Sequence, residues 1–247
     1  MNIEDFFKGN PKVALAFSGG VDSAYLLYAA VKYGCDVKAY YVKSAFQPQF
    51  ELDDALSLAK TLGAKMQIIK VDVMADPMVV ANPANRCYYC KKGIFGAILK
   101  AAREDGYTTI LDGTNASDDA GDRPGMKALE EYQVLSPLRL CGITKAQVRE
   151  LSREAGLFTW QKPAYACLAT RIKCGEEITE EKLKITEMAE NHLSMLGFVD
   201  FRVRMEENNA RVQVKKEQLR HLDVMRGEIL SGLKPYYDKI IFDSEGR

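Results

Sequence analysis

The chain has 247 residues, enough for one domain of medium size and a second small one. It carries 34 Lys and Arg residues against 34 Asp and Glu residues, so no overall charge favours nucleic acid or a membrane as a partner. No apolar run reaches the ~20 residues needed to span a bilayer, and Met1 to Asn10 is too short and acidic for a signal peptide. Six cysteines in a chain of this length do not indicate a secreted disulfide framework. We therefore expect a cytoplasmic protein with reduced thiols.

The first predicted elements are a buried strand at Lys12 to Phe17 and a helix from Val21 or Asp22 to Lys32. Paired glycines join them and leave backbone amides open to a ligand, with the positive end of the helix dipole behind them. Such a turn binds phosphate or pyrophosphate, whereas an acidic side chain in it suits a bridging Mg²⁺ or a helix cap. An ordinary serine-capped turn is the alternative, and the complete hexapeptide favours the phosphate site: Ser18-Gly19-Gly20-Val21-Asp22-Ser23.

Strands and helices alternate through the next part of the chain. Strands are predicted at 36–43, 65–71, 108–112 and 133–136, and helices at 49–62, 87–104, 126–132 and 144–155, the last capped by Thr144. This alternation predicts an α/β fold with a doubly wound parallel sheet.

The segment 157–175 is irregular and is predicted to be an active-site loop. After it we expect a helix at 179–195, a hairpin of strands at 201–205 and 210–214, a helix near 216–230 and a strand near 239–242. We therefore predict a nucleotide-binding domain at 1–175 and a small α+β domain at 176–247, serving substrate binding or oligomerisation.

A second acidic loop follows the strand at 108–112 and runs from Asp112 to Gly125. It leaves the carboxyl end of a parallel strand, where doubly wound sheets bind ligands. Its carboxylates, Asp118 among them, could share Mg²⁺, and Arg123 could hold a phosphate or a carboxylate. A solvated polar turn is the alternative, and the pairing with the first loop favours a ligand role.

The six cysteines divide into two groups. Cys35 and Cys141 have no cysteine neighbours and are predicted to be packing or surface thiols. Cys87 and Cys90 form a CxxC at a helix start, and Cys167 and Cys174 lie in the irregular segment. A four-thiolate zinc site, an iron–sulfur cluster on three thiolates, and a nucleophilic Cys167 near Arg171 and Lys162 all remain open.

Four stretches together resemble the LarE family of PP-loop ATP pyrophosphatases, the ATP-dependent sulfur transferases that help to make the nickel-pincer nucleotide of lactate racemase. The stretches are the hexapeptide 18–23, Asn85-Arg86-Cys87-Tyr88-Tyr89-Cys90-Lys91-Lys92, the loop from Asp112-Gly113-Thr114-Asn115 through Arg123-Pro124-Gly125 to Leu129, and Lys162-Pro163-Ala164-Tyr165-Ala166-Cys167-Leu168-Ala169-Thr170-Arg171. The resemblance covers nearly the whole chain.

The resemblance implies that ATP adenylylates a carboxylate of a pyridinium dicarboxylate mononucleotide and that sulfur then displaces AMP to give a thiocarboxylate. It implies ATP and Mg²⁺ as cofactors. From the residues themselves we expect Asp22 and Asp118 to hold Mg²⁺, and we expect a homo-oligomer that binds neither nucleic acid nor a membrane. The implied catalytic residues are Cys167, Ser18, Asp22 and Arg171. The implied nucleotide-binding residues are Ser18, Gly19, Gly20, Val21, Asp22, Ser23, Asp112, Gly113, Thr114, Asn115 and Arg123.

The sulfur source divides the family. One type sacrifices its own cysteine, at the position of Cys167, and another carries a [4Fe–4S] cluster on three cysteines. Cys87 and Cys90 accompany Cys167, which favours the cluster, and Cys174 is interpreted as a spare thiol. By the same resemblance Arg202 and Arg204 bind the substrate phosphate, with Glu190 as a further candidate, although Gln213 stands where an acidic residue is usual.

Two other functions remain possible from the sequence. One is a different PP-loop enzyme, either an amidating synthetase or a tRNA thiolase, although neither an ammonia-supplying domain nor a basic face is evident. The other is a non-catalytic adenine-nucleotide-binding protein of similar fold, since fold alone does not establish chemistry.

Overall fold

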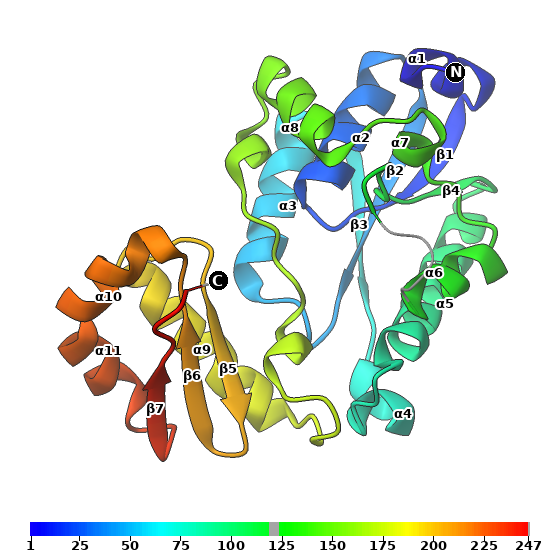
Figure 1. Cartoon of the computed structure of the whole chain (residues 1–247). Coiled ribbons are helices and arrows are strands. Elements are labelled where there is room, and N and C mark those ends of the chain that lie inside the picture. The colour runs from blue at the N-terminus through cyan, green and yellow to red at the C-terminus, as the bar shows by residue number, and fades with distance from the viewer. Residues whose placement is uncertain (119–123, 247) are drawn as a thin grey trace. The chain divides into compact units, whose positions relative to one another are not determined.

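A computed structural model describes residues 1–118 and 124–246 of the chain (Figure 1). The chain forms two compact units, Met1–Val73 with Asn85–Lys162, and Met74–Ala84 with Pro163–Arg247. The sequence predicted a single boundary near residue 175, whereas the packing divides the chain at Pro163 and adds 74–84 to the second unit. Buried Asn82 explains the difference, because its side chain donates to the Lys173 carbonyl at 2.8 Å and its own carbonyl accepts from Gly175 at 2.9 Å.

The first unit is built on a parallel sheet with the strand order β3-β2-β1-β4. Its strands are β1 (Lys12–Ala16), β2 (Asp36–Lys43), β3 (Lys65–Lys70) and β4 (Ile110–Leu111). The parallel α/β prediction is confirmed. The predicted strand at 133–136 reduces to one bridge between Leu135 and Leu111.

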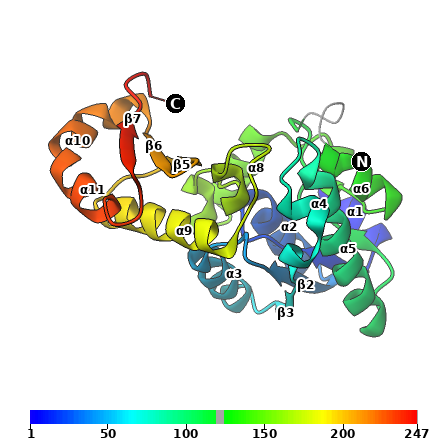
Figure 2. The same ribbon diagram turned by 90° about the horizontal axis from the view of Figure 1, so that it is seen from below.

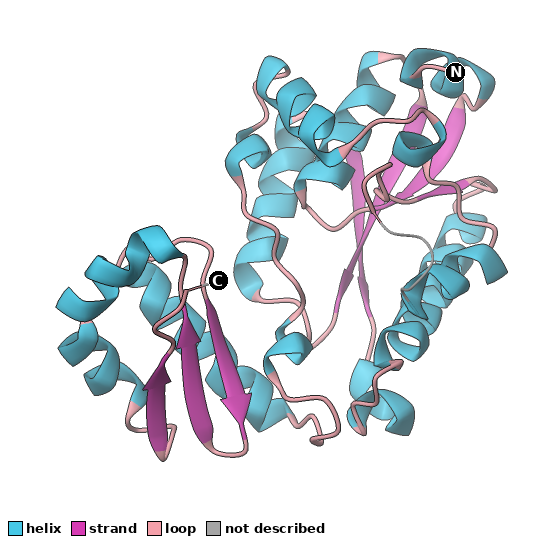
Figure 3. Cartoon of the chain, in the orientation of Figure 1, coloured by secondary structure: helices cyan, strands magenta, loops and turns pink. Residues whose placement is uncertain are grey.

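Helices cover both faces of this sheet (Figure 3). Alternate strand residues point to opposite faces, so Leu15 and Tyr41 join one apolar core and Ala14 and Tyr40 join the other. The helices of this unit are α1 (Ile3–Gly9), α2 (Val21–Lys32), α3 (Gln49–Thr61), α5 (Arg86–Glu104), α6 (Pro124–Glu131), α7 (Pro137–Leu140), α8 (Lys145–Glu154) and the 3₁₀ helix η2 (Phe158–Gln161).

The second unit is a three-stranded mixed sheet with helices packed on it (Figure 2). Strands β5 (Arg202–Glu206) and β6 (Asn209–Gln213) form the predicted antiparallel hairpin, and β7 (Lys239–Phe242) pairs with β6 in parallel. Its helices are α4 (Pro77–Val80), α9 (Glu180–Met195), α10 (Leu219–Val224), α11 (Arg226–Leu233) and the 3₁₀ helices η3 (Leu168–Arg171) and η4 (Lys216–Gln218). A further 3₁₀ helix, η1 (Val73–Ala75), lies where the chain enters this unit.

Capping residues explain several helix ends. Thr144 caps α8 and forms a capping box with Gln147, as the sequence predicted for Thr144, and Thr179 caps α9 by accepting from the Lys182 amide. The helix predicted near 216–230 is instead divided into η4, α10 and α11, with a break at Met225. Within the described parts of the chain, every helix is too short or too polar to cross a bilayer.

Candidate active site

The loops after β1 and β4 are neighbours because these two strands pair directly, with Leu15 opposite Leu111. From β1 the chain continues to β2 and β3 on one side, and β4 adds on the other side. This is the point at which the strand order reverses, where open α/β sheets bind their ligands. The topology therefore brings together the two loops that the sequence singled out.

The loop after β1 is tied together by two serines. Ser18 and Ser23 place their hydroxyl oxygens 3.1 Å apart, and the Gly20 amide donates to Ser18 Oγ at 3.3 Å. Gly19 has φ +73°, and a β-carbon there would lie 3.2 Å from Ala55 Cβ of α3. Glycine is needed because both the left-handed backbone and this close approach disfavour a side chain.

Helix α2 begins directly after this loop. Gly20 occupies its N-cap position, and among the described residues no side chain caps the helix there. The amides of its first turn, at Val21, Asp22 and Ser23, therefore remain available to an anion, with the positive end of the helix dipole behind them. Val21 and Ser23 are themselves buried, so the backbone and Ser18 supply the donors.

The loop after β4 packs against this first turn. A β-carbon on Gly113 would lie 3.0 Å from the Ser23 nitrogen and 3.3 Å from Asp22 Cβ. The Asn115 side-chain amide donates to Asp22 Oδ1 at 3.3 Å. Asp22, Gly113 and Asn115 thus lie together, as expected for one site.

The acidic residues of the second loop have different partners. Asp112 is buried and accepts from the Ser136 hydroxyl at 2.6 Å and from the hydroxyl of Thr114, so it shapes the loop. Asp118 Oδ2 accepts from the Asn115 backbone amide at 3.0 Å. Asn115 therefore links Asp22 to Asp118, the two carboxylates predicted to hold Mg²⁺. Arg123 lies outside the described residues.

Lys145 is a site residue that sequence reasoning missed. It is the first residue of α8, and its ammonium pairs with Asp22 Oδ2 while its backbone amide donates to Ser117 Oγ at 3.0 Å. One-third of its side chain is exposed. An ammonium next to a phosphate-binding loop can neutralise phosphate oxygens. The only signal in the sequence was a lysine directly after a helix cap that follows the second loop.

Within either unit, no three His, Cys, Asp or Glu side chains of the described residues are grouped to hold a metal ion. Cys87 and Cys90 lie in the first turn of α5 in the first unit, and Cys167 and Cys174 belong to the second unit. The three-cysteine cluster therefore stays a prediction. The Cys174 thiol donates to the Asn82 carbonyl at 3.5 Å.

The two remaining thiols, predicted to be packing or surface thiols, are partly buried and packed. Cys35 and Cys141 both lie against the apolar core formed by α1, α2 and their neighbours. Burial raises the pKa of Cys35 to about 11, and its Sγ donates to the Asn10 carbonyl at 3.2 Å. Burial also raises the pKa of Cys141. Burial therefore disfavours the reactive thiolate form of both residues.

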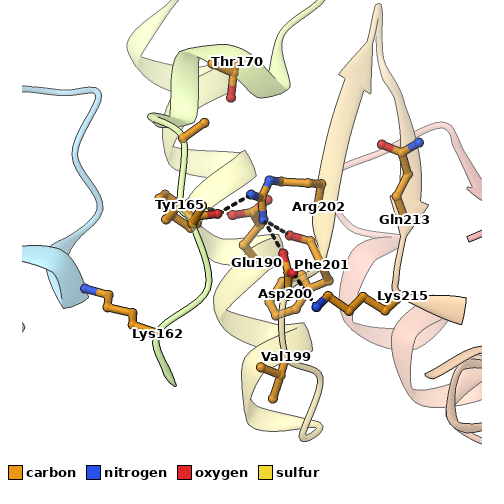
Figure 4. A network of polar contacts seen from close by, with 12 residues as sticks. Lys162, Tyr165, Thr170, Glu190, Val199, Asp200, Phe201, Arg202, Gln213 and Lys215 are labelled. Carbon is orange, nitrogen blue, oxygen red and sulfur yellow. Dashed lines mark hydrogen bonds and ion pairs between the residues drawn. The ribbon is translucent and has the colours of Figure 1, made fainter. Parts of the chain in front are cut away.

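In the second unit, Arg171 and Glu190 form a buried ion pair. Arg171 is 1% exposed, and its Nε and Nη2 donate to the two Glu190 oxygens at 2.6 and 3.1 Å. The Tyr165 hydroxyl and the Val203 amide also donate to Glu190, at 2.6 and 3.0 Å. Figure 4 shows Tyr165 and Glu190 meeting from separate segments of this unit.

The two arginines of β5 lie on the same face of the strand but differ in exposure. Arg202 is 7% exposed and donates to the carbonyls of Phe201 and Ala164 at 2.6 and 2.7 Å (Figure 4). Arg204 is exposed and donates to Gln213 Oε1 at 2.7 Å and to the Thr170 carbonyl at 3.1 Å. Arg204 is therefore the more accessible of the two to an anion from solvent.

Comparison with known proteins gives the following relatives. The chain is 37% identical over 251 residues to an uncharacterized protein of Synechocystis sp., which covers 99% of this chain and 93% of the relative. It is 33% identical over 210 residues to the pyridinium-3,5-bisthiocarboxylic acid mononucleotide synthase of Lactiplantibacillus plantarum, covering 84% of this chain and 76% of that enzyme. It is 27% identical to the tRNA-specific 2-thiouridylase of Fervidobacterium nodosum, over 61% of this chain and 54% of that enzyme. No family model matches the chain.

Proposed function

We propose a function from the family of this chain, which belongs to the LarE family of PP-loop enzymes, as does the pyridinium-3,5-bisthiocarboxylic acid mononucleotide synthase of L. plantarum. The proposed function is that of an ATP-dependent sulfur transferase acting on a pyridinium dicarboxylate mononucleotide. The contact between Gly113 and the first turn of α2 supports this proposal, because it brings together the two loops that we propose bind ATP. The product is a thiocarboxylate for the nickel-pincer nucleotide of lactate racemase.

The first half-reaction uses the loops of the first unit. A carboxylate oxygen of the acceptor attacks the α-phosphorus of ATP, and the bond from that phosphorus to the bridging oxygen of the β-phosphate breaks. Negative charge then builds on the departing pyrophosphate. The amides of Gly19 and the first turn of α2 would bind that charge, together with the Ser18 hydroxyl and the Lys145 ammonium.

Mg²⁺ fits the carboxylates of this site. The Asp22 carboxylate lies beside the phosphate loop, and Asn115 links it to Asp118. Hard oxygen ligands of this kind would suit Mg²⁺, which would neutralise negative charge on the phosphates. Lys145 occupies one oxygen of Asp22, so binding of Mg²⁺ with ATP would require this ion pair to loosen.

The second half-reaction delivers sulfur. A sulfur nucleophile attacks the carbonyl carbon of the acyl adenylate, and the bond from that carbon to the phosphate oxygen breaks to release AMP. We favour a [4Fe–4S] cluster on Cys87, Cys90 and Cys167, which supplies sulfide when bound, over direct loss of sulfur from Cys167. Thiolate side chains are the chemically suitable ligands, and all six cysteines of the described chain are thiols, consistent with the reducing cytoplasm where we propose the enzyme works.

Anaerobic purification followed by iron and sulfide analysis tests the sulfur source. We expect iron and acid-labile sulfide in the protein, and formation of thiocarboxylate while Cys167 stays intact by mass spectrometry. Iron-free protein that loses the mass of hydrogen sulfide at Cys167 during turnover would contradict the cluster and support the sacrificial cysteine.

The acceptor is tested separately from the sulfur source. We expect pyrophosphate release from ATP to depend on a pyridinium dicarboxylate mononucleotide. The likeness to a tRNA-specific 2-thiouridylase makes tRNA the rival acceptor. Release that depends on tRNA, or no release with either acceptor, would contradict the proposed substrate, and the second result would favour a nucleotide-binding protein without catalysis.

A further inference from the structure

Both peptide groups that flank Cys167 are held by one small cluster of the second unit. The Arg171 Nη1 donates to the Ala166 carbonyl at 3.1 Å and to Thr170 Oγ1 at 2.7 Å. Thr170 Oγ1 in turn donates to the Cys167 carbonyl at 2.8 Å, and the Thr170 amide donates to that carbonyl at 3.0 Å. The carbonyls before and after its α-carbon are both hydrogen-bonded, and the Cys167 backbone has φ −53° and ψ 152°.

Arg171 is itself immobilised by Glu190. Its two bonds to that carboxylate run in parallel, and Glu190 also accepts from Tyr165 and from the Val203 amide of β5. The cluster therefore ties the Cys167 turn to α9 and to β5. Because the guanidinium charge is balanced within a buried pair, Arg171 is poorly placed to act as a free cation for a substrate.

We propose that Arg171 is a positioning residue for Cys167, acting through Thr170, and that it aims the Cys167 sulfur for sulfur transfer. This inference rests on the proposed function, in which Cys167 carries or supplies the sulfur. The physical reason is geometric, since a reacting atom that is misplaced by ~1 Å can lose about 10²-fold in rate. A site held by a second layer of hydrogen bonds avoids that loss.

Thr170→Val tests the proposal, because it removes the hydroxyl link and leaves the Arg171–Glu190 pair in place. We expect single-turnover thiocarboxylate formation to fall about tenfold, with pyrophosphate release and the KM for ATP unchanged. Amide hydrogen exchange in a peptide spanning 164–172 should become faster. Thr170→Ser keeps the hydroxyl, so its rate of thiocarboxylate formation and its hydrogen exchange in 164–172 should equal those of the wild type.

Thr186→Val is the matched control. Thr186 is buried in α9 and its hydroxyl donates to the Lys182 carbonyl of the same helix at 2.7 Å, so this variant also loses a buried hydroxyl bond but keeps the bonds to the Ala166 and Cys167 carbonyls. We expect its sulfur transfer to equal that of the wild type. Arg171→Lys keeps the positive charge but cannot donate in parallel to Glu190, so we expect it to lose sulfur transfer at least as strongly as Thr170→Val.

Two results would overturn the proposal. One is sulfur transfer at the wild-type rate in Thr170→Val or in Arg171→Lys. A wild-type rate in Arg171→Lys would mean that the positive charge at position 171 is sufficient for sulfur transfer, without the parallel hydrogen bonds to Glu190. The other is an equal loss of pyrophosphate release and sulfur transfer in Thr170→Val. If the wild type itself releases no pyrophosphate, the proposed function fails instead, and the hydrogen-exchange comparison still reports whether Thr170 orders the turn.

Discussion

Gly113 lies directly against the backbone nitrogen of Ser23, so closely that a β-carbon on Gly113 would be 3.0 Å from it. The two residues are ninety positions apart in the chain, and they meet because β1 and β4 are paired. The second loop therefore forms one wall of the phosphate-binding turn. Any side chain at position 113 would push this wall away from the first turn of α2.

Gly113→Ala should impair the first half-reaction. The added methyl group meets backbone rather than a flexible side chain, so we expect a loss of stability of about 1–3 kcal/mol and at least a tenfold fall in kcat/KM for ATP-dependent pyrophosphate release. The control is Gly93→Ala, an exposed glycine of α5 with open space around it, which should keep activity and gain about 0.5–1 kcal/mol. Equal activity in the two variants would contradict the assigned role of Gly113.

Lys145→Met should slow pyrophosphate release without unfolding the protein. If the ammonium balances charge on the leaving pyrophosphate, its removal should lower kcat by about 10²–10³. Lys65→Met is the matched control, because Lys65 also forms an ion pair, with exposed Asp36 at 3.2 Å. Both residues lie at the first positions of their strands, whereas the candidate site lies after the last positions of β1 and β4. Wild-type kinetics in Lys145→Met would mean that Lys145 serves only as a partner of Asp22.

The sequence predicted those parts of the site that follow from local pattern. A strand, paired glycines and an amphipathic helix sufficed to place the amides at the start of α2, and the second loop followed from the end of β4. Lys145 was missed because it reaches Asp22 across 123 positions, a contact made by the fold alone. Nothing in local composition separates it from the other surface lysines.

In the second unit, too, contacts between residues far apart in the sequence were not predicted. The alternation of Arg202 and Arg204 predicted one shared face of β5 correctly, but not that the chain at Ala164 covers Arg202. Asn82 has φ +53° and donates to the Lys173 carbonyl 91 positions further on, so the inclusion of 74–84 in this unit had no local signal. Arg171 and Glu190 were both predicted to act at the site, and their mutual pairing required the three-dimensional structure.

Cys87→Ala tests the cluster by separating the two half-reactions. Loss of one of three ligands should abolish iron binding and cluster-dependent sulfur transfer, whereas ATP-dependent pyrophosphate release should remain within about twofold of wild type. Cys174→Ala is the control, since this exposed thiol donates to the Asn82 carbonyl and is not one of the three proposed cluster ligands. Full sulfur transfer in Cys87→Ala would exclude the three-cysteine cluster.

Asp105 should make stability depend on pH in the acid range. Its carboxylate accepts from Lys38 at 2.5 Å and from the buried Tyr40 hydroxyl at 2.6 Å. Both bonds lower the pKa of Asp105, and the bond from Lys38 has the larger effect. A lowered pKa in the folded state means that this stabilisation is complete above the ordinary aspartate value of about 3.9 and is lost as the pH falls through the lowered pKa.

Thermal unfolding of Asp105→Asn measures that contribution. We expect a lower Tm than wild type at neutral pH and a difference that shrinks as the solution is acidified. Asp223→Asn is the control, because Asp223 is 72% exposed and its pair with Arg226 at 3.5 Å should contribute little. A Tm difference for Asp105→Asn that stays constant down to strongly acidic pH would contradict the role given to its charge.

Removing one partner of the Arg171–Glu190 pair should lower the free energy of unfolding more than replacing both partners with apolar residues. Glu190→Gln leaves a buried guanidinium without its counter-charge, and we expect a loss of about 3–5 kcal/mol in the free energy of unfolding of the second unit. Arg171→Met combined with Glu190→Leu removes both charges and should lose less than either single variant, although Tyr165 and the Val203 amide lose an acceptor. Denaturant unfolding of the wild type, Arg171→Met, Glu190→Leu and the double variant gives the coupling energy directly. Additive losses would mean that the pair is not energetically coupled, and the rigid support inferred for Cys167 would then need another source.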